Sequence, residues 1–328
     1  MAELPDTSGL ICGFRLRAGE RPEPLDARFL AQPLVASDAP VWLHFNLSDT
    51  RAQAWLAACE VLPPAARNLL LGEDNHVQIQ TIAAGLCGVL ADLHYEFEAD
   101  PECFGQLRFY VDRSSIITGR QHPLKSVDRL RRDMIGGKVV ATPFDLLVQL
   151  VEDLAEMFAA VTLDQGDLID DIEDRILKVR EQFENAEVGR VRRLVSRLRR
   201  HVGAERQALS RVAQRLPAGW SEEESSRLRW AVERLDGIAQ DLESIQERGR
   251  LLQEEMAGRL AEATNRNLYI LSIVTVVFAP ITLLTGVFGM NVGGLPWLEN
   301  TVGFWWVAGF ITLTIFLTLI LLRWRRFL

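Results

Sequence analysis

The chain has 328 residues, enough for one large or two ordinary domains, with 36 basic and 44 acidic side chains and a net charge of −8. This acidic balance argues against nucleic acid as a partner. The lack of a CxxC pair among the four cysteines argues against a structural zinc site or a disulfide framework. Glu299 is the one acidic or basic residue between Arg266 and Arg323. A region suited to water is therefore followed by a region suited to lipid.

Residues 1–140 predict a cytoplasmic domain of mixed strands and helices. Four segments rich in β-branched and aromatic residues predict strands: LICGFRL, VWLHFNL, QLRFYV and SSIITGR. TRAQAWLAAC and PLKSVDRLRRDMI predict helices. Gly-rich phosphate loops, GxSxG and HExxH are missing from the sequence, and His44 lies between apolar strand residues, where a structural hydrogen bond is expected. We therefore expect an α+β domain that is not an enzyme.

Residues 141–220 predict an antiparallel helical hairpin. Thr142 and Pro143 suit the start of a helix that continues to about Glu187 and carries a cluster of acids. A basic helix follows from Gly189 to near Pro217. The simplest interpretation is a hairpin held by salt bridges between its acidic and basic helices. The alternative is that the acids form weak cytoplasmic sites for a divalent cation. They are Asp164, Asp167, Asp170, Asp171, Glu173 and Asp174.

A single long helix is predicted to begin at Ser221 and to end at Phe288. The run SEEE suits a helix N-terminus, because Ser221 and Glu224 can each accept the other's backbone N–H. Residues 221–267 form a cytoplasmic stalk, and residues 268–290 continue as a first membrane span. Apolar residues recur along the stalk in steps of three, four or seven, which predicts self-association. This stripe comprises Leu228, Leu235, Ile238, Leu242, Ile245, Leu252 and Met256.

Two uncharged apolar segments are long enough to cross a bilayer, which takes about 20 helical residues. They cover residues 268–290 and 303–322 and are joined by the loop 291–302. Arg259 and Arg266 precede the first span, and the tail 323–328 is basic, whereas the loop contains no Lys or Arg. The positive-inside rule therefore predicts a multi-pass membrane protein, embedded in lipid, with both termini in the cytoplasm and the loop outside.

One face of the first span is suited to line a water-filled pore at the centre of several copies. Its residues are mostly small or hydroxylic, and neutral oxygens can hold a hydrated divalent ion without trapping it. The second span carries bulky side chains and suits a lipid-facing ring. The alternative is that the small residues mediate tight helix packing without a pore. The face comprises Asn265, Leu268, Ser272, Thr275, Ala279, Thr282, Gly286 and Gly289.

The stretch Gly289-Met290-Asn291 closes the first span. Gly289 lets the backbone leave helical geometry, Met290 is expected to support the turn by packing, and the Asn291 amide can add an oxygen to a ring at the pore mouth. Glu299 makes the outer mouth negative if copies assemble around an axis, or else it is a solvated loop carboxylate. Pro280 removes one helical N–H, which predicts a bend or a gating point.

This Gly-Met-Asn signature, placed between two C-terminal spans, resembles that of the CorA family of divalent-cation channels and transporters. The residues that follow it, VGGLP, are more similar to the zinc-transporting ZntB branch than to the magnesium-selective branch, whose loop is acidic and MPEL-like. The resemblance covers the whole chain. It implies a funnel-shaped homopentamer in a bacterial inner membrane, with an axial pore lined by the first span and no tightly bound cofactor.

The resemblance also implies a cargo. Zn²⁺ would be taken up together with protons, Cd²⁺, Ni²⁺ and Co²⁺ are further expected cargoes, and Asn291 would lie at the outer entrance. Two other functions stay open: a Mg²⁺, Co²⁺ or Ni²⁺ channel gated by cations at the funnel, and a membrane-anchored scaffold or sensor. The residues implied on or near the pore axis are Thr282, Ala279, Leu271, Leu268 and Asn265.

Overall fold

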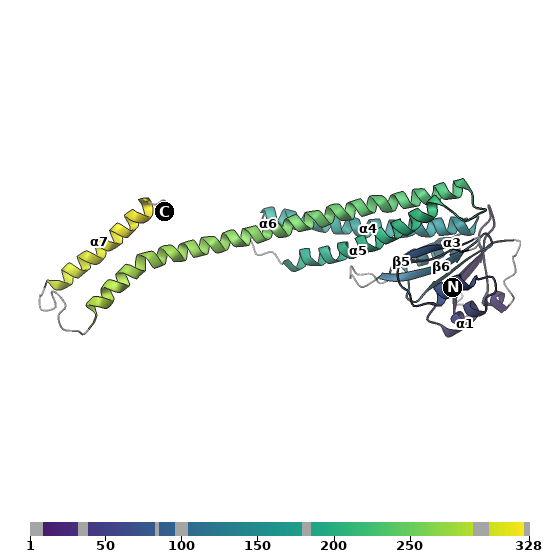
Figure 1. Ribbon diagram of the computed structural model, residues 1–328, viewed down its shortest axis with the longest axis horizontal. Coiled ribbons are helices and arrows are strands. Elements are labelled where there is room, and N and C mark those ends of the chain that lie inside the picture. The colour runs from purple at the N-terminus through teal and green to yellow at the C-terminus, as the bar shows by residue number, and fades with distance from the viewer. Residues whose placement is uncertain are drawn as a thin grey trace. The chain divides into compact units, whose positions relative to one another are not determined.

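The computed structural model describes residues 9–31, 39–82, 85–95, 104–178, 185–290 and 302–324. The chain consists of two units, Met1–Leu252 and Gln253–Leu328. The helix α6 (Glu222–Phe288) begins in the first unit and ends in the second (Figure 1). The sequence predicts one helix from Ser221 to Phe288, and this prediction is confirmed to within one residue.

The first unit is built on a seven-stranded sheet in the order β2-β1-β3-β7-β6-β5-β4. β3 and β7 are parallel, and the other neighbouring strands are antiparallel. The sequence predicts β1, β3, β6 and β7 and misses β2, β4 and β5. The strand β5 is buried along its whole length and therefore shows no alternation of apolar and polar residues. The strands are β1 (Leu10–Arg15), β2 (Glu23–Pro24), β3 (Val41–Asn46), β4 (Gln78–Ile82), β5 (Gly85–Leu93), β6 (Phe104–Val111) and β7 (Ser115–Arg120).

Helices cover both faces of this sheet. On one face, Leu56 and Leu70 of two short helices join Leu43 and Phe45 of β3 in a buried cluster. On the other face α3 and α4 pack against β5 and β7, so that the sheet lies between α1 and α3 (Figure 1). The helices of this unit before α6 are η1 (Ala27–Ala31), α1 (Thr50–Ala58), α2 (Pro64–Leu71), α3 (Lys125–Ile135), α4 (Pro143–Lys178) and α5 (Asn185–Gln214).

His44 has the structural role that its strand position predicts. The side chain is fully buried in β3, and its Nδ1 lies 2.8 Å from the Thr118 hydroxyl oxygen. That oxygen also accepts the Trp42 indole N–H at 2.9 Å. Burial lowers the pKa of His44 well below its ordinary value, so the ring is neutral. Nδ1 has the Thr118 hydroxyl as its partner, whereas Nε2 is buried without a hydrogen-bond partner among the described residues.

The boundary between the two hairpin helices differs from the prediction. α4 ends at Lys178 and Glu187 lies in the first turn of α5, so the predicted continuation of the first helix to about Glu187 is wrong. Residues 179–184 lie outside the described residues. Arg175 Nη2 is 2.8 Å from Glu187 Oε2, whereas a continuous helix would separate these residues by about 18 Å. This ion pair therefore joins two antiparallel helices.

Two acids of the α4 cluster are paired with a helix other than the predicted one. Glu173 Oε2 accepts an N–H from Arg248 Nη2 of α6 at 2.7 Å, and Asp170 pairs with the same nitrogen. The salt-bridged interpretation is therefore wrong for these two acids, because α6 brings a guanidinium to them that the hairpin alone does not contain. The ion pair Arg175–Glu187 joins α4 to α5 with the charges reversed from the expectation.

The apolar stripe of the stalk is buried inside the single chain from Leu228 to Leu252, whereas Met256 is half-buried. The buried members are therefore not available for the predicted self-association. Leu228, Leu235 and Leu242 have no exposed surface. The hairpin packs directly against the stripe, since a Cβ placed on Gly166 of α4 would lie 3.7 Å from Ile245 Cδ1 of α6. The spacing correctly indicates one buried face, but the partner is the chain's own hairpin.

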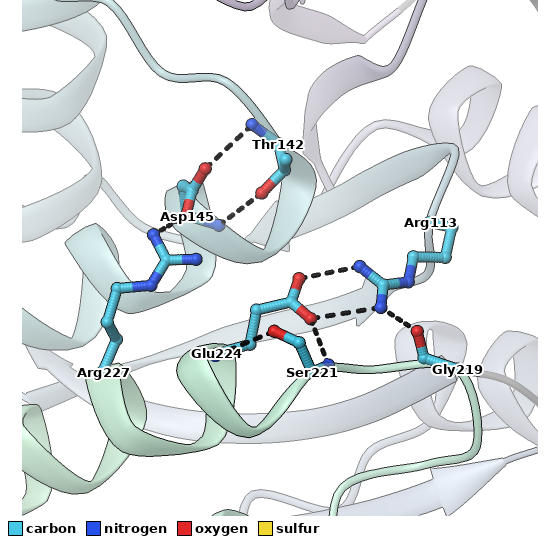
Figure 2. A network of polar contacts seen from close by, with 7 residues as sticks. All are labelled: Arg113, Thr142, Asp145, Gly219, Ser221, Glu224 and Arg227. Atoms are coloured by element: carbon cyan, nitrogen blue, oxygen red, sulfur yellow. Dashed lines mark hydrogen bonds and ion pairs between the residues drawn. The ribbon is translucent and has the colours of Figure 1, made fainter.

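The first turn of α6 is tied to the sheet by one carboxylate (Figure 2). Glu224 Oε2 accepts the Ser221 N–H at 2.7 Å and Ser221 Oγ accepts the Glu224 N–H at 3.1 Å, which confirms the capping predicted from SEEE. The same carboxylate accepts N–H groups from both Nη atoms of Arg113, in the β6–β7 turn, at 2.7 and 3.1 Å. Burial raises the pKa of Glu224, but these donors outweigh burial and leave the pKa below its ordinary value.

A second capping box begins α4 and joins it to α6 (Figure 2). Thr142 Oγ1 accepts the Asp145 N–H and Asp145 Oδ2 accepts the Thr142 N–H, both at 3.1 Å. Asp145 also pairs with Arg227, one turn into α6. Trp220, just before α6, packs edge-on against Phe144 with ring centroids 4.5 Å apart. The start of α6 is therefore fixed to both the sheet and α4.

Candidate functional site

The second unit contains the C-terminal part of α6 and the helix α7 (Gly303–Trp324). Both helices are long and apolar enough to cross a membrane by length and composition. The sequence predicts spans at 268–290 and 303–322, and the helices end at Phe288 and Trp324. The candidate site lies on the part of α6 that belongs to this unit.

The predicted pore-lining residues up to Met290 are exposed in the single chain, and Asn291 lies outside the described residues. The less exposed positions recur at helical spacing: Ile273, Val277, Pro280, Ile281, Leu284 and Phe288. Thr282 lies two and a half turns after Ile273, at about 100° per residue, and therefore on the opposite face. The exposed residues are Asn265, Leu268, Leu271, Ser272, Thr275, Ala279, Thr282, Gly286, Gly289 and Met290.

The helix α7 also has one less exposed face. Its members recur in steps of three or four and are Gly303, Val307, Ile311, Thr314, Thr318 and Leu322. Two helices packed along their lengths produce one such stripe on each partner. We infer that α7 covers the side of α6 that faces away from the predicted lining residues.

Hydroxyl groups on the exposed face donate their protons to the helix itself. Ser272 Oγ donates to the Leu268 carbonyl at 2.8 Å, and Thr275 Oγ1 donates to the Leu271 carbonyl at 2.9 Å. Thr282 Oγ1 donates to the Phe278 carbonyl at 2.9 Å. Because each proton is used, each oxygen keeps its lone pairs as acceptors for water or a hydrated cation. The face is neutral and offers acceptors.

The last turn of α6 is tight. The Gly289 N–H donates to the Thr285 carbonyl at 2.8 Å, and the Met290 N–H donates to the Val287 carbonyl at 3.4 Å. A Cβ on residue 289 would lie 2.9 Å from the Thr285 oxygen, so this position favours glycine. Met290 is 47% exposed, so in the single chain its side chain does not support the turn by packing in the expected way.

An open groove follows the exposed face of α6. It contains the predicted residues Thr275, Ala279, Thr282, Gly286 and Met290. Sequence analysis missed its other lining residues, which lie one position from the predicted stripe, so a wider stripe would have included them. They are Val274, Phe278, Leu283 and Val287.

The structure describes the predicted acids of α4 but not the predicted residues of the loop between the two spans. Asn291 and Glu299 lie outside the described residues. The acids Asp164, Asp167, Asp171 and Asp174 are exposed on α4. Within the described ranges, no three His, Cys, Asp or Glu side chains of one chain are grouped so that they could hold a metal ion.

Two known transporters resemble this chain over most of its length. The zinc transport protein ZntB of Yersinia enterocolitica is 29% identical over 295 residues, which cover 89% of this chain and 88% of that protein. The divalent cation transporter CmaX of Pseudomonas aeruginosa is 29% identical over 305 residues, or 92% of each chain.

The fold resembles solved structures over the full length. The structure of the full-length CmaX protein has a TM-score of 0.85 at 28% identity and covers 99% of both chains. The CorA magnesium transporter from Methanocaldococcus jannaschii has a TM-score of 0.79 at 15% identity, with 95% of this chain and 98% of that chain covered, which shows a shared fold.

A family model for the CorA-like Mg²⁺ transporter protein matches residues 37–325. The match begins after β2 and extends past the end of α7, and so includes most of the first unit and the whole of α6. The chain belongs to the CorA-like Mg²⁺ transporter family.

Proposed function

We propose that this protein carries divalent metal cations, with Zn²⁺ as its main cargo, through the axis of a homopentamer in a bacterial inner membrane. The observation that supports the pore most directly is the exposed face of α6, which presents neutral acceptors at Ser272, Thr275 and Thr282. It lies on an uncharged segment of α6 that is long enough to span a bilayer, in a member of a cation transporter family.

A pore requires several copies, because one pair of helices cannot enclose water. In the proposed ring, α6 of each copy faces the axis and α7 faces lipid, with Asn291 amides forming a collar at the outer mouth. Glu299 makes this mouth negative. The first units form a cytoplasmic funnel, both termini lie in the cytoplasm, and the four exposed acids of α4 remain weak cation sites at its surface.

Zinc is favoured over magnesium by two observations. ZntB of Yersinia enterocolitica is named as a zinc transport protein, and VGGLP after the Asn291 position lacks the acidic residues of an MPEL-like loop. Neutral oxygens that hold an ion through its hydration shell discriminate weakly among similar divalent ions, so we expect Cd²⁺, Ni²⁺ and Co²⁺ to pass as well. No cofactor needs to be tightly bound for this transport.

The second candidate is a Mg²⁺ channel, which the description of the family model favours. The two candidates also differ in energy source, because the zinc proposal includes uptake coupled to protons. The described parts of both spans up to Leu322 contain no acidic or basic side chain that could carry the proton, so its carrier would lie outside them.

Ion flux into proteoliposomes tests the proposal. We expect Zn²⁺ to enter vesicles that contain the protein, and Asn291→Ala to abolish or strongly reduce entry. Asn68→Ala, on the exposed surface of α2, is the matched control and should transport like the wild type. Equal entry into protein-free vesicles would instead favour a membrane-anchored scaffold or sensor. Repeating the assay with Mg²⁺, and with and without a pH gradient, decides the cargo and the proton coupling.

A further inference from the structure

Two acidic side chains are buried together in the first unit, and neither is among the residues that the proposed transport uses. Asp92 of β5 and Glu205 of α5 both have 0% exposure. Removing an ionised carboxylate from water is costly unless a positive charge or several hydrogen-bond donors compensate for it. The surroundings of each carboxyl therefore decide in which protonation state it is held.

Glu205 lies where the edge of the sheet is incomplete. β4 pairs with β5 as far as Val89, and Ala91 lies two residues further along β5. The Ala91 N–H donates to Glu205 Oε1 at 2.7 Å, so a side chain of α5 replaces a strand as the partner of this backbone group. Glu205 Oε2 is buried and has no hydrogen-bond partner among the described residues.

Asp92 has a contrasting set of partners. Its carboxylate accepts the Leu93 N–H at 2.7 Å, the Ser126 N–H at 3.2 Å and the Ser126 hydroxyl. Burial raises the pKa of Asp92 to about 6 against the lowering effect of these donors. Asp92 can therefore be ionised near neutral pH, whereas Glu205 has a single donor for its two oxygens.

Basic side chains near α5 do not neutralise Glu205. Among the charged groups of the described residues, the carboxylate of Asp92 acts on Glu205, and its effect is repulsive. Arg206, the next residue of α5, pairs instead with Asp236 of α6 at 2.7 Å. β4 has no ionisable side chain.

Two further titratable groups on the elements that pack here have other partners. His201, one turn before Glu205 on α5, stacks on the ring of Phe104. The buried Asp153 of α4 accepts a hydrogen bond from Gln149 at 2.9 Å. Neither supplies a positive charge to the second oxygen of Glu205.

We propose that Glu205 is a proton-binding site, held in its neutral protonated form at neutral pH, whose proton keeps α5 docked on the open edge of the sheet. Ionisation would leave a buried charge with one donor beside Asp92. Burial, followed by the Asp92 charge, raises the pKa of Glu205 well above its ordinary value. Because the folded-state pKa exceeds the unfolded value, this stabilisation is complete below the unfolded value and is lost as the pH rises. Docking of α5 therefore weakens at alkaline pH.

Thermal unfolding of the full-length protein in detergent, at pH 5 and pH 8, tests the site with Glu205→Gln. The amide oxygen can still accept the Ala91 N–H, but the side chain cannot ionise. We expect the Tm of Glu205→Gln relative to the wild type to rise between pH 5 and pH 8 by at least about 2–4 °C. Glu243→Gln on the exposed side of α6 is the control and should show no such rise.

An infrared difference spectrum between the wild type and Glu205→Gln at pH 7 measures the proton directly. A carbonyl-stretch band of a protonated carboxylic acid, lost in the variant, supports the proposal. Absence of the band, or a Tm of Glu205→Gln that falls further below the wild type at pH 8 than at pH 5, would overturn it. If Glu205→Gln does not fold, Glu205→Leu provides the same infrared comparison. Neither measurement uses metal flux, so each result is independent of the transport proposal.

Discussion

Large apolar side chains are buried in the first unit of the chain and exposed in the second. In the first unit, Trp42 and Phe109 have no exposed surface, because helices cover both faces of the sheet. In the second unit, Leu271, Phe304 and Trp324 are 61%, 73% and 78% exposed. Exposed apolar surface on this scale marks contact with a membrane or with other proteins. The first unit therefore contains its own core, whereas the second leaves apolar side chains uncovered in the single chain.

The change from buried to exposed apolar side chains takes place within the single helix α6. Its buried stripe ends at Leu252, which is 5% exposed, and the next residues of the stalk and the span are exposed or half-buried. What changes is the presence of the hairpin, which covers the stripe in the first unit.

A matched pair of leucine truncations should give the largest difference between the units. Leu235→Ala removes a fully buried side chain from the first unit and should lower the free energy of unfolding by about 2–5 kcal/mol. Leu271→Ala removes an exposed one and should leave the unfolding of the first unit unchanged. Denaturation followed by circular dichroism measures both. Equal destabilisation by the two variants would contradict the comparison.

Glu224→Gln should weaken the attachment of α6 to the sheet by about 1–3 kcal/mol at pH 7, because it removes the charged partner of Arg113. The folded-state pKa of Glu224 lies below its ordinary value, so its stabilisation is present above the unfolded pKa and is lost as the pH falls. The difference from the wild type should therefore shrink toward acidic pH, opposite to the trend at Glu205. Unfolding at several pH values checks this, and a difference that grows on acidification would refute it.

Gly289→Ala should disturb the end of α6 without affecting the first unit. The added Cβ would lie 2.9 Å from the Thr285 carbonyl, and relieving such crowding costs about 1–3 kcal/mol. We expect slower Zn²⁺ flux with unchanged unfolding of the first unit. Gly258→Ala is the control, since nothing lies within 4 Å of its added methyl group. Similar flux in the two variants would show that the tight turn does not matter for transport.

The smallest expected effect comes from single hydroxyls of the exposed face. Thr282→Val keeps the shape but removes the acceptor, which should slow Zn²⁺ flux about fivefold, equivalent to about 1 kcal/mol. Thr282→Ser keeps the hydroxyl and should transport nearly as fast as the wild type. If Thr282→Ser is as slow as Thr282→Val, the methyl group matters and the hydroxyl does not.

The sequence predicted α6 well because its signals are local. SEEE marks the start, and helix formers continue without a strong break except Pro280, through which the helix runs. The partner of the stalk stripe could not be predicted, because periodicity shows that a face is buried but not what buries it. Arg248 is separated from Glu173 by 75 residues, so this contact has no local signal either.

The sequence contains a signal for the burial of Glu205 that the sequence analysis did not use. Glu205 falls on the same helical stripe as Leu198, Val202, Leu209 and Val212, all of which are buried. A charged residue at a core position of an amphipathic helix indicates a special environment. Its pairing with Ala91 depends on where β4 begins, and β4 itself was not predicted.

The central claim is that the exposed face of α6 lines a water-filled path for cations. Cysteine accessibility during Zn²⁺ flux tests it, in a protein whose four native cysteines are replaced. A water-soluble, positively charged thiol reagent should label Thr282→Cys and block flux, and should leave Val277→Cys, on the opposite and less exposed face, unlabelled with flux intact. Block through Val277→Cys together with an unreactive Thr282→Cys would contradict the account.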